Sequence, residues 1–236
     1  GIPSNASSLP SGVGVLSLVS ESFDTNSVPT SVSTLTPSSP SAAVPCFTGI
    51  ASGAGACSID SGVIDDGNGG QLLLTDASGL SGNSSGVVVK QSFSSTSALY
   101  AEFSSQSYGG GGASRTLWLI DASAPKPTIM TGVGTGGYGG SSGGIPGAVL
   151  GISFDALGSA SLANNAACPA NGWDSSKSSA DQVVVRAGDT SGSRGLSGYC
   201  FVTSTSQPFG SLGGTTKSVG PLHQSDASAG WQHFFV

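Results

Sequence analysis

Charged side chains are scarce in this sequence, making up 8% of its 236 residues. The 13 acidic residues outnumber the 7 lysines and arginines, and the basic residues form no cluster along the chain. Proteins that bind nucleic acid need a basic stripe to contact phosphates, so we expect no nucleic-acid partner. Long hydrophobic runs are also missing, and none approaches the roughly 20 residues of a membrane-spanning helix. We therefore expect no membrane span.

Glutamate is nearly absent as well, since Glu21 and Glu102 are the two in the chain. Hydrolysis of a glycosidic bond commonly uses two carboxylates that flank the bond, about 5–5.5 Å apart in retaining enzymes. No segment has the Glu-x-Asp-x-Glu spacing that would place several acids on one face of a strand. We expect a protein without catalytic activity. A polysaccharide hydrolase remains an alternative, because aspartate can take the place of glutamate.

Two segments, 82–86 and 139–143, match the Gly-x-Ser-x-Gly motif of serine hydrolases. A nucleophile of that kind lies on a sharp turn between a strand and a helix, and no helical pattern follows either match. A chain with 38 glycines and many serines produces such matches by chance. The motif therefore does not indicate a serine hydrolase.

Helical periodicity is missing throughout, and short apolar or alternating runs separated by turn-forming residues recur instead. These runs predict strands at residues 13–20, 71–75, 86–91, 98–103, 115–120, 147–155, 182–187, 198–203 and 231–236. Short strands without helical connections favour an all-β fold, an antiparallel β-sandwich or jelly roll. We expect residues 1–12 to form a tail or linker, residues 13–236 to form one domain, and residues 26–55 to be largely irregular.

The four cysteines are Cys46, Cys57, Cys168 and Cys200. An even number of cysteines in a chain rich in Ser, Thr and Gly favours two disulfides and an oxidising compartment. Three pairings are open, and we favour the one between nearest neighbours, Cys46 with Cys57 and Cys168 with Cys200. The predicted location is extracellular or at the cell surface.

The stretch 132–161 combines a glycine-rich loop with a strand that ends in a carboxylate. Glycine at nearly every second position disfavours both helix and central strand, so residues 132–144 are predicted to form a loop. Tyr138 lies within it and is a candidate for an exposed aromatic that stacks on a ligand, and Tyr108 is a weaker one. Trp118, between leucines in an apolar run, is expected in the core instead. The strand AVLGISFD follows and ends at Asp155.

Four segments in order, QLLLTDASGLSGNSSGVVVKQSF, ALYAEFSSQSYGGGGASRTLWLIDAS, GGYGGSSGGIPGAVLGISFDALGSAS and DQVVVRAGDTSGSRGLSGYCFV, resemble the legume-type (L-type) lectin domain, especially its bacterial branch. The resemblance covers about residues 62–236. Its most specific part is GIPGAVLGISFDALGS, which is similar to the family's GIPGG-x-LGVGFD-x-x-GN. The resemblance implies a concanavalin A-like jelly roll of two antiparallel sheets.

The same resemblance implies a sugar site in which the glycine loop presents backbone N–H groups, here those of Gly139 and Gly140. It also implies that Asp155 binds calcium and a transition metal. Where the family has further oxygen ligands or a sugar-binding aspartate, this chain has Ala113, Ser153 and Ser159. Calcium commonly takes six to eight oxygen ligands, so the metal site is expected to be absent or rebuilt, with calcium as the candidate ion.

We therefore expect a secreted or cell-surface carbohydrate-binding, lectin-like module whose partner is a glycan or polysaccharide. The closing segment WQHFFV resembles a family strand after which further strands normally follow, so the domain could be truncated at its C-terminal end. A strand edge left open there would favour self-association. The alternative function is a structural or adhesive subunit of a surface appendage or phage particle that uses the sandwich as a scaffold.

Overall fold

A computed structural model gives the fold of the chain. It describes residues 17–24, 26–37, 45–57, 70–75, 85–94, 96, 99–108, 114–130, 145, 147–158, 180–187, 200–205, 222 and 232–236. All regular structure within these ranges is β-strand, which confirms the predicted all-β class. The same ranges contain no helix with the length and apolar character needed to cross a membrane. Residues 1–12 lie outside them, and the single-domain organisation stays a prediction.

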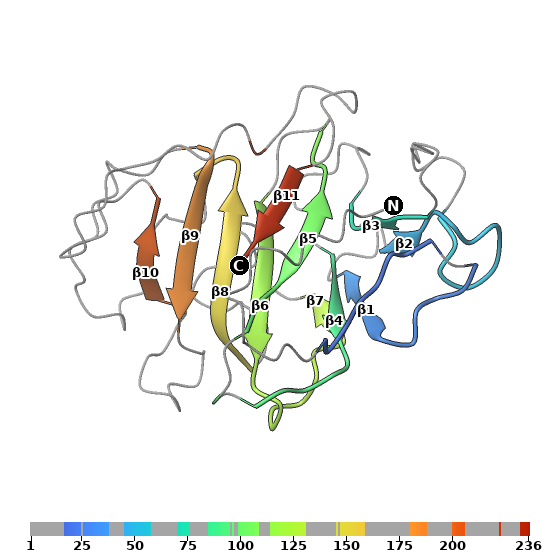
Figure 1. Ribbon diagram of the computed structural model, residues 1–236, viewed down its shortest axis with the longest axis horizontal. Coiled ribbons are helices and arrows are strands. Elements are labelled where there is room, and N and C mark those ends of the chain that lie inside the picture. Colours follow the sequence, from blue (N-terminus) through green and yellow to red (C-terminus); the bar gives the residue numbers. More distant parts are fainter. Residues whose placement is uncertain are drawn as a thin grey trace.

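The largest sheet has four antiparallel strands in the order β10-β9-β8-β6 (Figure 1). Its strands are β6 (Ser114–Ile120), β8 (Ala148–Asp155), β9 (Gln182–Ala187) and β10 (Cys200–Ser204). The segment with the most specific sequence pattern, β8, lies inside this sheet between β6 and β9. Its last residue, Asp155, is opposite Ser114 on one neighbour and Gln182 on the other.

Side chains of β8 alternate between the two faces of the sheet, as the period of two in a strand requires. Phe154 and its partner on β9, Val183, belong to one apolar cluster. Val184, the partner of the adjacent Ser153, belongs to a different cluster on the opposite face. Both faces are therefore covered. This explains why the strand is mostly apolar with few exposed positions.

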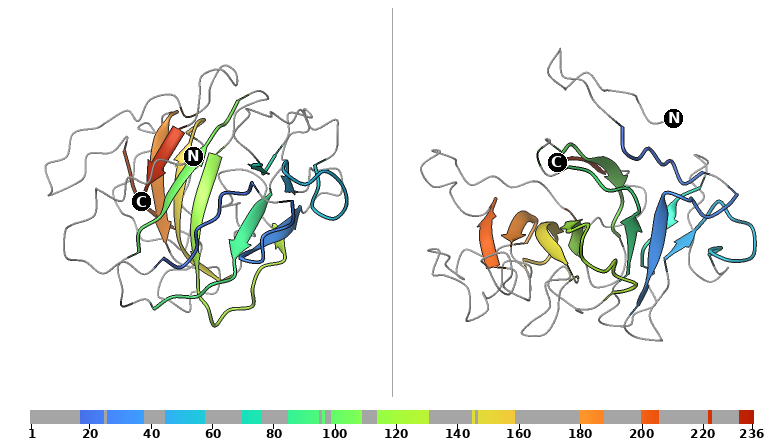
Figure 2. Two further views of the ribbon diagram at one scale, coloured as in Figure 1. Left: turned by 45° about the vertical axis from the view of Figure 1, so that its right-hand side comes forward. Right: turned by 90° about the horizontal axis from the view of Figure 1, so that it is seen from below.

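A two-stranded antiparallel sheet of β5 (Glu102–Ser105) and β11 (Gln232–Phe235) packs on one face of the four-stranded sheet (Figure 2). Three phenylalanines form the contact. Phe154 lies edge-on to Phe234 at 4.4 Å between ring centroids, and Phe103 stacks on Phe234 at 5.0 Å. Aromatic pairs of this kind contribute about 0.5–1.5 kcal/mol each beyond the burial of apolar area. The packing therefore joins the C-terminal strand to the centre of the molecule.

A second group of strands lies beside β5, towards the opposite side from β10 (Figure 1). It consists of a sheet in the order β4-β1-β7, with β1 (Val32–Pro37), β4 (Gly86–Val89) and β7 (Ile129–Met130), and a pair β2 (Cys46–Phe47) and β3 (Leu72–Leu73). The pairing of β1 with β7 is parallel and the others are antiparallel. Buried Val32, Phe47 and Ile50 hold these strands together.

Most predicted strands are confirmed, with boundaries that shift by a few residues. The expectation that residues 26–55 are largely irregular missed two strands, because β1 and β2 both lie there. In VSTLTP the buried Val32 and Leu35 lie three positions apart among Ser and Thr, so the segment lacks the alternation from which a strand is predicted. The predicted strand at 13–20 is not seen in its described part, 17–20.

The disulfide between Cys46 and Cys57 joins β2 to the turn that follows it. It confirms half of the predicted pairing, and Cys200 is also disulfide-bonded. Cys168 lies outside the described residues. A disulfide fits an oxidising compartment, as the cysteine content predicted.

Candidate functional site

Asp155 is fully buried at the end of β8. Its Oδ1 accepts hydrogen bonds from the Ser114 hydroxyl at 2.8 Å and from the backbone N–H groups of Leu157 and Gly158 at 3.1 and 3.0 Å. Gly158 has a positive φ of 80°, which lets the chain turn sharply back after the strand. The carboxylate therefore fixes the turn at the end of the strand that follows the glycine loop.

The face of the sheet that carries Asp155 is polar along two rows. Gln182, opposite Asp155 on β9, is buried, and Ser153 is completely shielded from solvent. Thr116 on β6 donates its hydroxyl to the Ser153 oxygen at 3.1 Å. Hydrogen bonding compensates for much of the cost of burying such groups. The hydrogen bonds of Ser114 to Asp155 and of Thr116 to Ser153 therefore support the register of β6 against β8.

The residues around Asp155 fit the lectin-type calcium centre poorly. Three donors already engage Oδ1, and Ser153, where the family has a metal-binding acid, accepts a hydrogen bond from Thr116. Within the described part of the chain, no three His, Cys, Asp or Glu side chains come close enough to share an ion. Calcium requires a shell of oxygen ligands. The contacts of Asp155 are those of a structural carboxylate.

After the glycine-rich stretch, the described residues begin with Ile145, which is buried, and Gly147. Gly147 has φ of 76°, and a Cβ atom there would collide with the side chain of Ala124. Its carbonyl accepts a hydrogen bond from the N–H of Asp121 at 2.9 Å. These contacts fix the backbone at the start of β8.

The predicted sugar-binding residues Tyr138, Gly139 and Gly140 lie outside the described residues, as do Ala113 and Ser159. Their roles remain predictions. The described flanks show that the loop runs from β7, in one sheet, to β8, in another. Its position in the chain therefore makes it the connection between the two main sheets.

Arg115 is a functional candidate that sequence reasoning did not single out. From β6, its guanidinium donates to the Ser105 hydroxyl, the Leu222 carbonyl and Gln232 Oε1 at 3.0, 2.8 and 3.1 Å. It also lies 5.0 Å from the centre of the Phe234 ring, a cation–π distance. Among the described residues, its buried Nε has no hydrogen-bond partner. Burial lowers the pKa of Arg115 to about 10, so the side chain remains charged at neutral pH.

The two glutamates have different surroundings. Glu21 accepts hydrogen bonds from the Ser31 hydroxyl at 2.9 Å and from the N–H of Phe23, which packs against the β2 strand. Glu102 is exposed on β5 and accepts a hydrogen bond from the Tyr100 hydroxyl at 3.3 Å. The contacts of Glu21 are those of a local structural residue.

The aromatic side chains divide between the interior and the surface. Trp118 packs against the cluster of Ile145, Ala148, Val184 and Phe201, as expected of a core residue. Tyr108, a weaker candidate for an exposed stacking aromatic, is half-buried, and burial raises its pKa. Tyr100 and Phe93 are exposed instead.

Comparison of the chain with protein-family models, with curated proteins and with solved structures finds no match.

Proposed function

We propose that this chain is a secreted or cell-surface carbohydrate-binding module without catalytic activity, built on a concanavalin A-like β-sandwich. The observation that carries the proposal is the position of β8. It is an inner strand of an antiparallel sheet, it follows the glycine loop directly, and its terminal Asp155 secures the next turn. This is the order of loop, strand and aspartate for which the sequence resembles L-type lectins.

The position of the loop supports a binding role. Residues 131–144 lead from β7 to β8, and therefore from one sheet to another. Loops carried on a rigid β framework commonly hold binding residues. In this proposal the ring of Tyr138 stacks on a sugar, and the N–H groups of Gly139 and Gly140 bind its hydroxyls.

The absence of catalysis is supported by the acidic residues. Glu21 is held by Ser31 and Phe23, while Glu102 lies on β5 beside Tyr100. A glycoside hydrolase needs one protonated and one ionised carboxyl group facing each other across the substrate. The hydrogen-bond partners of Glu21 and Glu102 among the described residues are hydroxyl and backbone N–H groups, not a second carboxyl group.

A secreted or surface location is supported by the disulfide between Cys46 and Cys57. Disulfides form and persist in oxidising environments such as the cell exterior. The low content of lysine and arginine is compatible with a neutral polysaccharide as ligand, because such a ligand offers no phosphate or sulfate to a basic residue.

A glycan array tests the proposal, with the wild-type chain and Tyr138→Ala applied at equal concentration. We expect saturable binding of the wild-type chain to at least one glycan class and weaker binding of the variant. Failure of the wild-type chain to bind any glycan, in an array supplemented with plant, fungal and bacterial polysaccharides, would exclude the proposed function.

A second candidate is a structural or adhesive subunit that assembles with copies of itself. The observation that favours it is apolar exposure at a sheet edge: Val202 on β10 is half exposed, and β10 has a single strand neighbour among the described residues. Such an edge can pair with another chain. Sedimentation velocity distinguishes the candidates, because ordered assembly without sugar supports the scaffold and a monomer that binds glycan supports the lectin.

A further inference from the structure

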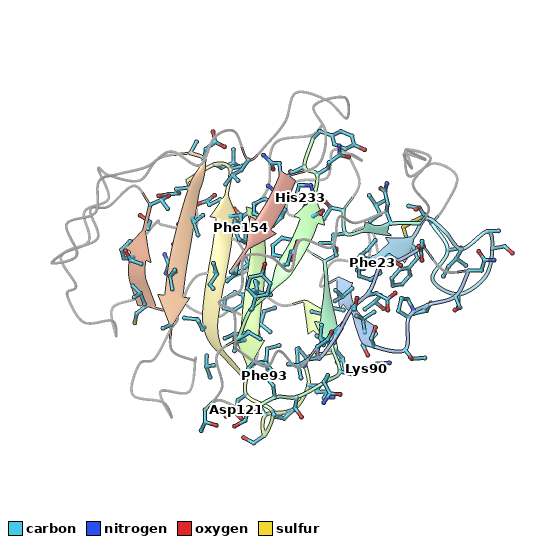
Figure 3. All side chains as sticks on the ribbon, in the orientation of Figure 1. Phe23, Lys90, Phe93, Asp121, Phe154 and His233 are labelled. Atoms are coloured by element: carbon cyan, nitrogen blue, oxygen red, sulfur yellow. A yellow bond between two sulfur atoms is a disulfide. The ribbon has the colours of Figure 1, made fainter. Side chains whose placement is uncertain are left out.

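The β5–β11 sheet presents two different faces. Phe103 and Phe234 turn inward onto Phe154, whereas Glu102, Ser104 and His233, from the same two strands, are exposed. The strand register places His233 opposite Ser104. Figure 3 labels His233 on β11 and Phe154 on β8. The alternation of the two strands therefore places Glu102, Ser104 and His233 on the outward side.

Tyr100 also belongs to this outward group. It lies two residues before Glu102, the first residue of β5. Its hydroxyl donates to Glu102 Oε2 at 3.3 Å, and 37% of the residue is exposed. Ala101 forms two backbone hydrogen bonds with Val236, at 2.8 and 2.9 Å, which extend the pairing of the strands beneath Tyr100. We call Tyr100, Glu102, Ser104 and His233 the outer face of the β5–β11 sheet.

The outer face offers the groups that bind a sugar. A tyrosine ring provides an apolar surface with a polar tip. Ser104 hydrogen-bonds to His233 Nδ1 at 2.9 Å, and Nε2 has no hydrogen-bond partner among the described residues. Glu102 keeps Oε1 as an acceptor in addition to the oxygen that Tyr100 engages. A carboxylate accepts hydrogen bonds from hydroxyls, and an imidazole nitrogen can donate or accept one.

The spacing of these groups follows from strand geometry. Residues two apart on one strand, such as Glu102 and Ser104, are separated by about 7 Å along it. His233 is directly opposite Ser104, at the roughly 5 Å distance of a cross-strand pair. The polar groups therefore cover an area comparable to one or two sugar rings, with Tyr100 at one end.

We propose that the outer face of the β5–β11 sheet is a carbohydrate-binding surface, separate from the glycine loop, on which Tyr100 stacks against a pyranose ring while Glu102 and His233 bind its hydroxyls. The inference rests on the proposed function. It assigns that function a second set of residues, all of them in the described part of the chain. The ligand class is a neutral oligosaccharide or polysaccharide rich in adjacent hydroxyl groups.

A hydrolytic role for Ser104 and His233 is less well supported by their contacts. A serine nucleophile needs a histidine base that is itself oriented by a third group. Among the described residues, His233 has Ser104 as its hydrogen-bond partner and no carboxylate on the other ring nitrogen, while Glu102 is engaged by Tyr100. Binding of a sugar needs no such base, and the side chains can bind one in the positions that they occupy.

The rigidity of the surface supports the same role. The sheet beneath it is held by stacked Phe103 and Phe234 and by Arg115, which hydrogen-bonds to Ser105 and Gln232 on the inward side. A preorganised surface loses little conformational entropy on binding. This suits a weak, polar ligand such as a glycan.

The experiment compares five full-length proteins: the wild type, Tyr100→Ala, Tyr100→Phe, Glu102→Gln and Phe93→Ala. Each is run in affinity gel electrophoresis against soluble β-glucan, xylan, mannan and galactan, and the polysaccharide that retards the wild type is then used for titration calorimetry. Phe93 is the matched control, because it is an exposed aromatic (42% exposed) outside the outer face. Circular dichroism and the unfolding midpoint show whether each variant is folded.

We expect Tyr100→Ala to raise Kd about tenfold or more, as the loss of an aromatic anchor does. Tyr100→Phe should remain within about threefold of the wild type because the ring is kept, and Phe93→Ala should be unchanged. Glu102→Gln, which preserves shape, should weaken binding by about threefold to tenfold because an ionised acceptor is lost.

Wild-type affinity in both folded variants, Tyr100→Ala and Glu102→Gln, would overturn the inference and leave the proposed function intact. If the wild type binds none of the polysaccharides here and no glycan on the array, the proposed function and this inference fail together. Assembly of the wild type that Tyr100→Ala abolishes, without any glycan binding, would identify the outer face as a protein contact instead and would also overturn the inference.

Discussion

The buried carboxylate of Asp155 stabilises the end of β8. It receives one hydroxyl and two backbone N–H groups on the same oxygen, at the point where β8 ends. Asp155→Ala leaves those three donors unsatisfied in a buried place, so we expect a loss of about 2–4 kcal/mol in the free energy of unfolding. Asp155→Asn keeps an acceptor oxygen and should cost less. Urea denaturation of both variants measures the difference.

A calcium role for Asp155 predicts a different response. If the carboxylate held an ion, EGTA would lower the unfolding midpoint of the wild type and added calcium would restore it. The hydrogen bonds to Oδ1 predict the same midpoint with EGTA and with calcium. A calcium-dependent shift in thermal unfolding, lost in Asp155→Asn, would show that the structural interpretation is wrong.

Gly147 is required for two reasons at the start of β8. Its φ of 76° is unfavourable for other residues, and an added Cβ would meet Ala124. We expect Gly147→Ala to destabilise the protein by about 1–3 kcal/mol. Gly53→Ala is the matched control, because its φ is also positive, at 97°, but the space around it is open. Equal losses in thermal unfolding of the two variants would show that the contact with Ala124 contributes nothing.

The burial of a single residue could be predicted from the sequence where its immediate neighbours determine its environment. Trp118, between leucines in an apolar run, packs on the core as expected. Arg115 was not singled out, because its partners Leu222 and Gln232 are more than 100 residues away in the chain. The sequence does show Arg115 as a single charge at the start of an apolar strand. Its partners could not be predicted, because the fold brings them together.

At the scale of elements, β11 depends on β6 through Arg115. The guanidinium reaches Gln232 and the Leu222 carbonyl and lies against the Phe234 ring. Arg115→Ala should destabilise the protein by about 2–4 kcal/mol, because it leaves polar partners unpaired and opens a cavity beneath the aromatic rings. The loss should be independent of pH near neutrality, since the pKa of Arg115 is about 10.

Hydrogen exchange shows which part of the molecule is destabilised in Arg115→Ala. The N–H groups of Ala101 and Val236 are bonded across the sheet, so both should exchange faster in Arg115→Ala. Lys126→Ala is the control, because the Lys126 ammonium is exposed and donates to the Lys90 carbonyl. Unchanged protection of Ala101 and Val236 in Arg115→Ala would show that β11 is held without the arginine.

Strands with a clear apolar pattern, such as β6, β8 and β9, were predictable, whereas the pairing of strands was less so. Alternation in AEFSS and QHFF indicates which side chains share a face within each strand. Nothing local indicates that these two segments, about 130 residues apart, pair with each other. The strand β1 was missed because its apolar residues are Val and Leu among Ser, Thr and Pro.

At the scale of the whole molecule, the disulfide between Cys46 and Cys57 stabilises a part of the chain with short strands. It closes a loop with a sequence separation of 11 beside the cluster of Val32, Phe47 and Ile50. Replacing both cysteines by serine should lower the free energy of unfolding by about 2–3 kcal/mol, the loop-closure value for this length. Denaturation of the double variant measures it, and a change under about 0.5 kcal/mol would show that the strands position this loop unaided.

In the described part of the molecule, a four-stranded antiparallel sheet is covered on one face by the pair β5 and β11, which exposes Glu102, Ser104 and His233. All-β class and antiparallel pairing were predictable, because turn-forming residues separate short apolar runs throughout. The positions of Tyr138, Gly139 and Gly140 stay predictions, since glycine-rich sequence leaves loop conformation open.

The measurement that tests the central claim most directly is the binding of the intact wild-type chain to a broad glycan array, followed by titration calorimetry with the best ligand. The account predicts saturable binding to a neutral glycan, unaffected by EGTA and weakened about tenfold in Tyr100→Ala. No binding to any glycan by a folded wild-type chain would contradict the claim that this protein is a carbohydrate-binding module.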